Sequence, residues 1–291
     1  MKFGKVEDPS QIDFSLPDTP KETIQFLNKY KSDEDFEINI GYPKWSKADL
    51  KGFYPRGTKD ELRYYSEEFN SVEFNGTFYR SPSKEQVLIW KNRTADDFKF
   101  CPKFTNSISH YSRLNNTDEK VAAFIDSTVL FEEKLGMGFI QMPENFRPKA
   151  FDRLEGFLNR FPKGYPLAFE VRHEEWYNDE QTLNNYLKLL KKTNTTNIIV
   201  DTPGRRDMLN FQLTTPVAFI RFVSSTDVID KLRLSEWVTK IKEWKEAGLK
   251  QVYFFVHQKI DPETPFLSTD FVKELNEQLG CKLPIAQKKA L

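Results

Sequence analysis

The sequence predicts an α/β protein: a single (β/α)8 TIM barrel with an N-terminal extension and a short or irregular sixth helix. Short apolar runs rich in Phe, Val and Ile recur eight times, and amphipathic charged segments separate them. No linker, repeat or low-complexity tract divides the chain. Strand followed by helix, eight times over, is typical of a parallel barrel. We therefore assign residues 1–35 to an extension packed on the barrel and residues 36–291 to the barrel domain.

The expected strands are short and almost continuously apolar, as strands covered on both faces should be. In chain order they span residues 36–41, 71–75, 98–103, 138–142, 166–172, 197–201, 217–222 and 251–257.

The segments between the strands carry helix signals, and we expect helices at 58–69, 83–90, 151–161, 182–192, 234–248 and 269–280. Thr58 and Ser83 open the first two, each followed three residues later by the Glu or Gln of a capping box. Gly248 is the expected C-cap of its helix. The segment 202–216 is too short for a full helix, which predicts a loop with one helical turn.

Composition favours a globular protein without a strong electrostatic field. Of 291 residues, 38% are apolar, and 43 basic residues balance 43 acidic ones. A neutral chain lacks the field that drives non-specific nucleic-acid binding, so nucleic acid is a disfavoured partner. Cys101 and Cys281 stand far apart in no CxxC arrangement, which fits a reducing compartment. With no signal peptide and no apolar run of roughly 20 residues, we expect a cytoplasmic protein that does not enter membranes.

Polar residues gather at the C-terminal ends of the predicted strands. Strand residues alternate between the barrel axis and the helices, and counting by two turns a set of ionisable or amide side chains inward. That set is Glu73, Asn75, Lys103, Gln141, Glu170, Arg172, Asp201, Arg221 and His257. The other two histidines, His110 and His173, also follow strands. Active sites of such barrels lie at this face, although a rim of mutually neutralising ion pairs is the competing explanation.

Seven stretches, in order at seven of the eight strand ends, carry a family resemblance: GYPKWSKADLKGFYPRGT (41–58), FNSVEFNGTFYRSP (69–82), FKFCPKFTNSISHYSRL (98–114), LGMGFIQMPENFRP (135–148), FEVRHEEW (169–176), VDTPGRRD (200–207) and YFFVHQ (253–258). They resemble the YecE-like family, catalogued as domain of unknown function 72, from about residue 37 to 280. The resemblance implies a TIM barrel and no established activity.

By match, the recurrent polar positions of that family fall on Trp45, Glu73, Asn75, Thr77, Tyr79, Lys103, His110, Gln141, Glu170, Arg172, His173, Trp176, Asp201 and Arg221. The run Ser224-Ser225-Thr226 departs from the family pattern after Arg221, so whatever it contacts can differ here.

The leading hypothesis is an enzyme that acts by acid–base chemistry on a small phosphate- or carboxylate-bearing substrate. Its expected catalytic residues are Glu73, Glu170, His173 and Asp201. Its expected substrate-binding residues are Trp45, Asn75, Tyr79, Lys103, His110, Gln141, Arg172, Arg205, Arg221 and His257. Five cations suggest the anion, namely Lys103, Arg172, Arg205, Arg206 and Arg221.

Other functional hypotheses for these residues remain open. Glu73, Glu170 and Asp201 could ligate a divalent metal together with His173 and His257, as in barrels of the xylose-isomerase and endonuclease-IV type. A metal-dependent repair nuclease that binds nucleic acid is a second class of function. Lys103 could instead be a Schiff-base nucleophile, given a lowered pKa. A ligand-sensing or partner protein without catalysis is a third class. Whether the reaction is that of a hydrolase, lyase or isomerase, which substrate it takes and which oligomer forms are questions the sequence leaves open.

Overall fold

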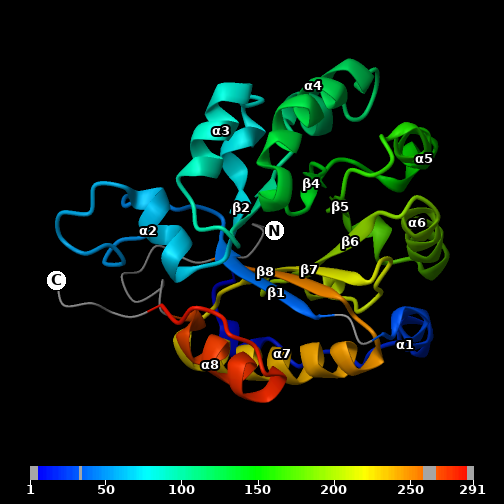
Figure 1. Cartoon of the computed structure of the whole chain (residues 1–291). Coiled ribbons are helices and arrows are strands. Elements are labelled where there is room, and N and C mark those ends of the chain that lie inside the picture. Colours follow the sequence, from blue (N-terminus) through cyan, green and yellow to red (C-terminus); the bar gives the residue numbers. More distant parts are fainter. Residues whose placement is uncertain (1–5, 33–34, 258–266, 287–291) are drawn as a thin grey trace.

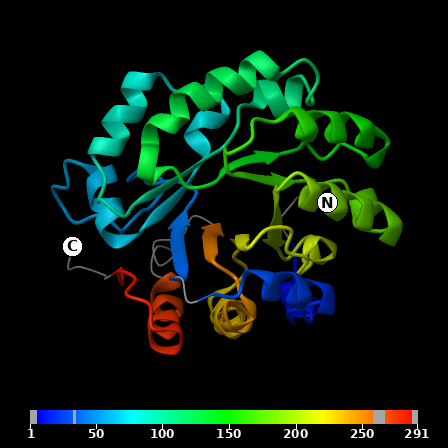
Figure 2. The ribbon, with the colours of Figure 1, turned by 45° about the vertical axis from the view of Figure 1, so that its right-hand side comes forward.

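Eight parallel strands form a nearly closed barrel in the computed structural model, which describes residues 6–32, 35–257 and 267–286 (Figures 1 and 2). The strand order is β3-β2-β1-β8-β7-β6-β5-β4. Two isolated bridges, Phe100 with Leu135 and Lys103 with Phe139, join the chain at β3 to that at β4. The predicted TIM-barrel-like α/β fold is therefore confirmed.

The strands lie close to their predicted positions. They are β1 (Glu37–Tyr42), β2 (Ser71–Phe74), β3 (Lys99–Pro102), β4 (Gly138–Gln141), β5 (Leu167–Glu170), β6 (Thr196–Asp201), β7 (Val217–Val223) and β8 (Gln251–His257).

Helices surround the strands, as Figure 2 shows. They are α1 (Lys21–Leu27), α2 (Glu61–Glu68), α3 (Lys84–Asn92), α4 (Asp118–Thr128), α5 (Phe151–Arg160), α6 (Glu180–Lys192), α7 (Asp227–Ala247) and α8 (Ser268–Leu279). Short helical turns are η1 (Pro9–Gln11), η2 (Asn28–Tyr30), η3 (Asn75–Phe78), η4 (Ser107–Tyr111), η5 (Val129–Lys134), η6 (Pro148–Ala150), η7 (Glu174–Trp176) and η8 (Arg206–Met208). The turn η8 is the single-turn element expected between β6 and β7.

Three helices differ from expectation, two in where they begin and one in being present. The N-cap of α2 is Asp60, whose side chain accepts from the Arg63 backbone N–H at 3.0 Å, so the prediction of Thr58 is wrong. Helix α7 begins at Asp227, before the predicted 234, although Gly248 is its C-cap as predicted. Helix α4 was not among the expected helices. Ser83 caps α3 as predicted, accepting from the Gln86 N–H at 3.2 Å.

The interior of the barrel is apolar below its polar C-terminal end. Cys101, Phe139, Phe219, Tyr253 and Phe255 belong to one buried cluster inside the ring of strands. Two further clusters lie between strands and helices, and the second includes Phe169 and Val171, as the period of two predicted. Because the rest of the interior is apolar, the side chains that could bind or react with a polar ligand are those at the C-terminal ends of the strands.

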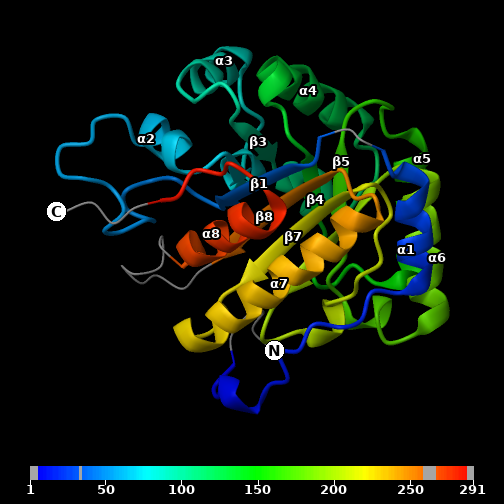
Figure 3. The same cartoon turned by 60° about the horizontal axis from the view of Figure 1, so that its bottom comes forward.

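The N-terminal segment packs on the outside of the barrel against α7 (Figure 3). Thr23 Oγ1 donates to the Phe211 carbonyl at 2.9 Å, and Trp244 Nε1 donates to Thr19 Oγ1 at 2.9 Å. Gly248 has φ +119°, and a Cβ there would lie 2.3 Å from the Leu27 carbonyl oxygen. Only glycine lets the end of α1 approach the end of α7 so closely.

Candidate functional site

A buried ion cluster at the C-terminal end of the barrel is centred on Arg221, which β7 turns inward. Its Nε and Nη2 donate to the Glu73 carboxylate of β2 at 3.0 and 3.1 Å, and its Nη1 donates to Glu170 of β5 at 2.6 Å. The exposed fractions are 0% for Glu73, 1% for Glu170 and 6% for Arg221. One guanidinium thus joins two carboxylates from different sides of the barrel, using the bidentate geometry that arginine favours.

The cluster extends from Glu170 to Lys103 through an amide. Arg172 Nε donates to Glu170 Oε1 at 2.5 Å, and Gln141 Nε2 donates to both Glu170 oxygens at 3.0 and 3.2 Å. Gln141 Oε1 then accepts from Lys103 Nζ at 2.9 Å. Because the Glu170 carboxylate binds the amide nitrogen of Gln141, the amide oxygen of Gln141 points toward Lys103.

Glu73 also contacts His257, the last residue of β8, and Asn75, which directly follows β2. His257 Nε2 lies 2.7 Å from Glu73 Oε2, and Asn75 Nδ2 donates to Glu73 Oε1 at 2.9 Å. With Nε2 turned to a carboxylate, the imidazole presents its Nδ1 on the other side of the ring. This is the arrangement that orients a histidine for proton transfer.

The carboxylates of the cluster are held ionised. Burial would raise the pKa of Glu170, but Arg172 and Arg221 outweigh it and lower that pKa to about 2. Burial acts in the same way on Glu73, and Arg221 with His257 holds its pKa well below the usual range. Both groups are therefore carboxylates near neutral pH and are poorly suited to donate protons.

Lys103 and His257 have pKa values lowered mainly by burial. Burial and the neighbouring Arg221 lower the pKa of Lys103 to about 8. Burial lowers the pKa of His257 too, against the attraction of Glu73. Burial therefore favours the uncharged form of both groups, the form that accepts a proton.

A cavity of about 660 Å³ opens beside Lys103, at the end of β2 and between the loops that follow β1 and β2. Trp45, Phe74, Phe78 and Tyr79 contribute its aromatic lining, together with Asn75. The Tyr79 side chain is 80% exposed to solvent, which is unusual for a large aromatic residue. The volume is that of an ordinary small-molecule pocket.

Trp45, which lines this cavity, and His110 both pack against phenylalanine side chains of its lining. Trp45 packs on Phe74 with ring centroids 4.8 Å apart. The His110 ring lies edge-on to Phe78 at 5.0 Å, and Lys103 Nζ lies 4.4 Å from the centroid of that same Phe78 ring. Burial and the charge of Lys103 lower the pKa of His110. His110 is therefore within the electrostatic reach of the lysine.

His173 and Arg205 are engaged in local contacts. His173 Nδ1 accepts from the Glu175 backbone N–H at 3.2 Å and caps the turn η7. Arg205 donates to Asp207 at 2.6 and 2.7 Å and to the Arg172 carbonyl at 2.7 Å. Neither residue shares a contact with the Glu73–Arg221–Glu170 centre among those described for it.

The prediction that Asp201 points into the barrel is wrong. Asp201 accepts from Trp237 Nε1 at 2.9 Å and pairs with Arg233 at 2.7 Å, and both partners lie on α7. Arg206, predicted to join the cations at the barrel mouth, bonds to Asp201 instead. Val200, one residue earlier, belongs to the interior cluster. Asp201 therefore stabilises the packing of α7 on β6.

The residues expected as metal ligands do not converge. Arg221 occupies the space between Glu73 and Glu170, Asp201 faces α7, and His173 caps η7. Over residues 6–32, 35–257 and 267–286, no three or more His, Cys, Asp or Glu side chains are grouped to hold a metal ion. A cation between the carboxylates would have to displace the arginine.

Sequence reasoning did not single out Phe78, Arg233 or Trp237. Phe78 forms the apolar surface under Lys103 Nζ, whereas Arg233 and Trp237 bind the carboxylate of Asp201. Phe78 lies three residues after Asn75 in a stretch already noted for its polar residues, so its position was the available signal. The α7 residues lay inside an ordinary amphipathic helix pattern and gave none.

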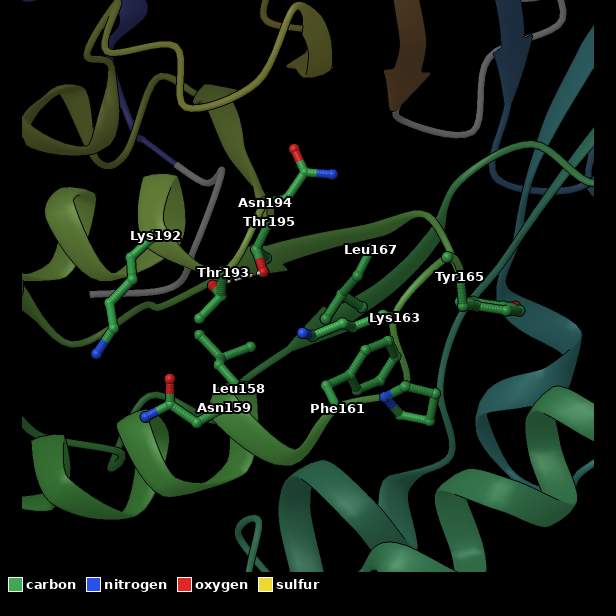
Figure 4. Close-up of a pocket in the computed structure, with 12 residues that line it drawn as sticks. Leu158, Asn159, Phe161, Lys163, Tyr165, Leu167, Lys192, Thr193, Asn194 and Thr195 are labelled. Carbon is green, nitrogen blue, oxygen red and sulfur yellow. Dashed lines mark hydrogen bonds between the residues drawn. The ribbon is translucent and has the colours of Figure 1, made fainter.

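A second hollow, of about 450 Å³, lies at the other end of the barrel (Figure 4). The loops that enter β5 and β6 line it, with Lys163 and Lys192 as its charged residues. Among the residues that the structure describes, no carboxylate or histidine lines this hollow. This end of a TIM barrel usually contributes to the stability of the fold and not to catalysis.

Among the described helices, none combines the length and apolar character needed to cross a bilayer.

Comparison with known proteins agrees with this fold. The chain is 28% identical over 282 residues to the UPF0759 protein YecE of Escherichia coli strain K12, covering 87% of this chain and 99% of that protein. A DUF72 family protein from Thermotoga maritima has a crystal structure with TM-score 0.65 and 23% identity, covering 82% of this chain and 99% of that one. One from Enterococcus faecalis gives 0.64 and 19%, with 85% and 99% covered. The family described as "Protein of unknown function DUF72" matches residues 39–290. The chain therefore belongs to the DUF72 family, as the resemblance of its strand ends predicted.

Proposed function

We propose that this protein is an enzyme that acts by acid–base chemistry on a small anionic molecule bound in the cavity beside Lys103. One observation carries the proposal. Glu73 and Glu170 are both paired with arginines, and within the described part of the chain Lys103 has no carboxylate partner. An ammonium group that is buried to this extent normally pairs with an anion, because desolvation disfavours its charge.

The charges of the cluster support an anionic ligand. Lys103, Arg172 and Arg221 contribute three positive charges, and Glu73 with Glu170 contributes two negative charges. With a neutral imidazole at position 257, one positive charge is left over. A phosphate or carboxylate group at Lys103 would balance it, and the aromatic lining of the cavity would cover the rest of the ligand.

We assign proton transfer to Lys103 and His257 and positioning to the carboxylates. Glu73 orients His257 through Nε2, and Glu170 orients Lys103 through Gln141. This assignment replaces the expectation that Glu73 and Glu170 transfer protons themselves, because their lowered pKa values keep them ionised.

We also propose that the protein is located in the cytoplasm, because Cys101 and Cys281 are both free thiols.

Binding of inorganic phosphate, measured by calorimetry, tests the anion site. We expect Lys103→Met to weaken binding at least tenfold. Lys192→Met, at the opposite end of the barrel, is the matched control and should bind phosphate like the unaltered protein. Equal phosphate binding by Lys103→Met and the unaltered protein would contradict the proposal, and so would the absence of binding in both.

Turnover tests the acid–base step. Small phosphorylated and carboxylate compounds that compete with phosphate are incubated with the protein in D2O and followed by NMR. His257→Asn should retain binding but lose exchange or conversion, since the asparagine amide cannot accept the proton. Retained turnover in this variant would remove His257 from the chemistry. The nucleic-acid and ligand-sensor hypotheses stay predictions from the sequence, because no contact described above favours either.

A further inference from the structure

Lys103 differs from Lys134, the other lysine that is buried among the described residues. Lys134 is 5% exposed, and its Nζ donates to the carbonyls of Lys91 and Thr94 at 3.0 Å each and to Thr94 Oγ1 at 3.3 Å. Those three bonds use all the protons of the ammonium group and bind the C-terminal end of α3. Lys134 is therefore a structural lysine with its hydrogen-bonding capacity filled.

Lys103 is 7% exposed but has one hydrogen bond among the described residues, to Gln141 Oε1 at 2.9 Å. Its other contacts among the described residues are with aromatic rings, and Arg221 as well as the arginine-paired carboxylates Glu73 and Glu170 act on its charge through space. Nζ lies 4.4 Å from the Phe78 ring centroid and 5.7 Å from that of Phe139, and Arg221 is close enough to lower its pKa. Among the described residues Lys103 binds no helix end and no carboxylate, so a structural role would not require a lysine here.

We infer that Lys103 is a covalent nucleophile that forms a Schiff base with the carbonyl carbon of a small anionic aldehyde or ketone. The inference rests on the proposed function, and it narrows the substrate from any small anion to an oxo acid or a phosphorylated carbonyl compound. The side chain lines the 660 Å³ cavity, so a ligand there reaches the amine directly. The aromatic lining limits water at the reacting carbon.

The chemistry balances without an oxidant or reductant. The neutral amine of Lys103 attacks the carbonyl carbon, forming the N–C bond while the carbonyl π electrons move to oxygen. Proton transfer gives a carbinolamine, and its oxygen then leaves as water as the C=N bond forms. Hydrolysis reverses these steps and restores the amine.

The environment suits both states of the lysine. With a pKa of about 8, roughly one-quarter of the Lys103 side chains are neutral at pH 7.5 and able to attack. The protonated imine carries the same positive charge as the ammonium group, so the cluster keeps its excess charge for the anionic end of the substrate. Gln141, fixed by Glu170, holds Nζ in place through its oxygen.

Reductive trapping tests the inference. The full chain is incubated with pyruvate, dihydroxyacetone phosphate or glyceraldehyde 3-phosphate in the presence of cyanoborohydride, and adducts are located by peptide mass spectrometry. We expect one adduct per chain on Lys103 with at least one of these probes. Lys103→Arg should lose that adduct and keep its folded circular-dichroism spectrum. Lys134 and Lys192 are internal controls that should stay unmodified at the same probe concentration.

The pH profile separates Lys103 from adventitious labelling. Trapping at Lys103 should rise steeply between about pH 6.5 and 8.5, whereas exposed lysines, with a pKa near 10.4, should react at higher pH. Adducts spread evenly over exposed lysines, or equal labelling of Lys103→Arg, would overturn the inference, as would no adduct with any probe.

Failure of the covalent step can be told apart from failure of the proposed function. If phosphate binds in a Lys103-dependent way but no adduct forms, Lys103 is an anion-binding or acid–base residue and the Schiff-base inference is wrong. If phosphate neither binds nor competes with trapping, the proposed anion site is wrong as well.

Discussion

Replacement of Arg221 by Met removes the cation shared by Glu73 and Glu170 and keeps a side chain of similar length. Three hydrogen bonds are lost, and the two carboxylates stay buried. Breaking a buried ion pair from one side typically costs about 3–5 kcal/mol. We expect the lower end, about 3 kcal/mol, because Arg172 still pairs with Glu170 and His257 with Glu73.

The loss of stability should depend on pH. In the unaltered protein the Glu170 pKa is about 2, so its contribution is present above the unfolded value near 4.5 and is lost as pH falls toward 2. Without Arg221, burial acts with less opposition and raises both carboxyl pKa values. The folded variant then takes up protons that the unfolded chain does not, and the difference between the two proteins shrinks as pH falls from 7 to about 4.5.

Urea unfolding followed by tryptophan fluorescence, at pH 7 and at about pH 4.5, measures this difference. Arg147→Met is the matched control, because Arg147 pairs with Glu175 at 3.0 Å with both side chains about half exposed. That exposed pair should contribute at most about 1 kcal/mol. If Arg221→Met costs no more than Arg147→Met, or if its cost is the same at both pH values, the description of the cluster as a buried, mutually dependent set of charges is wrong.

Three further changes test the elements that position the site. Asp60→Ala should lower the midpoint of urea unfolding by removing the N-cap of α2, at about 1 kcal/mol, whereas Thr58→Ala should cost less. Gly248→Ala should destabilise the protein by more than about 1 kcal/mol, because φ is +119° and Leu27 leaves no room for a Cβ; proteolysis of the N-terminal segment should then quicken. Trp237→Phe leaves a buried carboxylate of β6 without one donor and should cost about 1–3 kcal/mol in the same unfolding assay.

The sequence was sufficient to place the eight strands because each is a short apolar run between amphipathic segments. The period of two also placed Glu170 and Arg221 correctly at the interior end of the barrel. It worked there because one face of each strand carries polar or charged residues toward its end. The same reasoning located Glu73 and Lys103 on the inward face.

The reasoning failed for Asp201 because β6 is apolar on both faces. Ile199 and Val200 are equally apolar, so alternation could not decide which of them faces the axis. The deciding contacts come from Arg233 and Trp237, more than thirty positions away on α7. A single sequence contains no local signal for such a pairing.

Local competition explains the other differences. Thr58 and Asp60 are both good capping residues two positions apart, and propensity does not choose between them. His173 follows a strand like a site residue, but its imidazole is used as the cap of a short helical turn. Which carboxylate pairs with which cation depends on the closure of the barrel, which brings β2, β5 and β7 together only in three dimensions.

The protonation midpoint of Lys103 decides whether this lysine is a buried cation without a carboxylate partner. Protein labelled with ¹³C at the lysine ε-carbon is titrated by NMR, and Lys103→Arg identifies the signal. We expect a midpoint of about 8, well below that of an exposed lysine, because Lys103 is buried beside Arg221 without a carboxylate partner among the described residues. A midpoint at about 10.4, the value of an ordinary exposed lysine, would contradict both the anion site and the nucleophile proposed at this position.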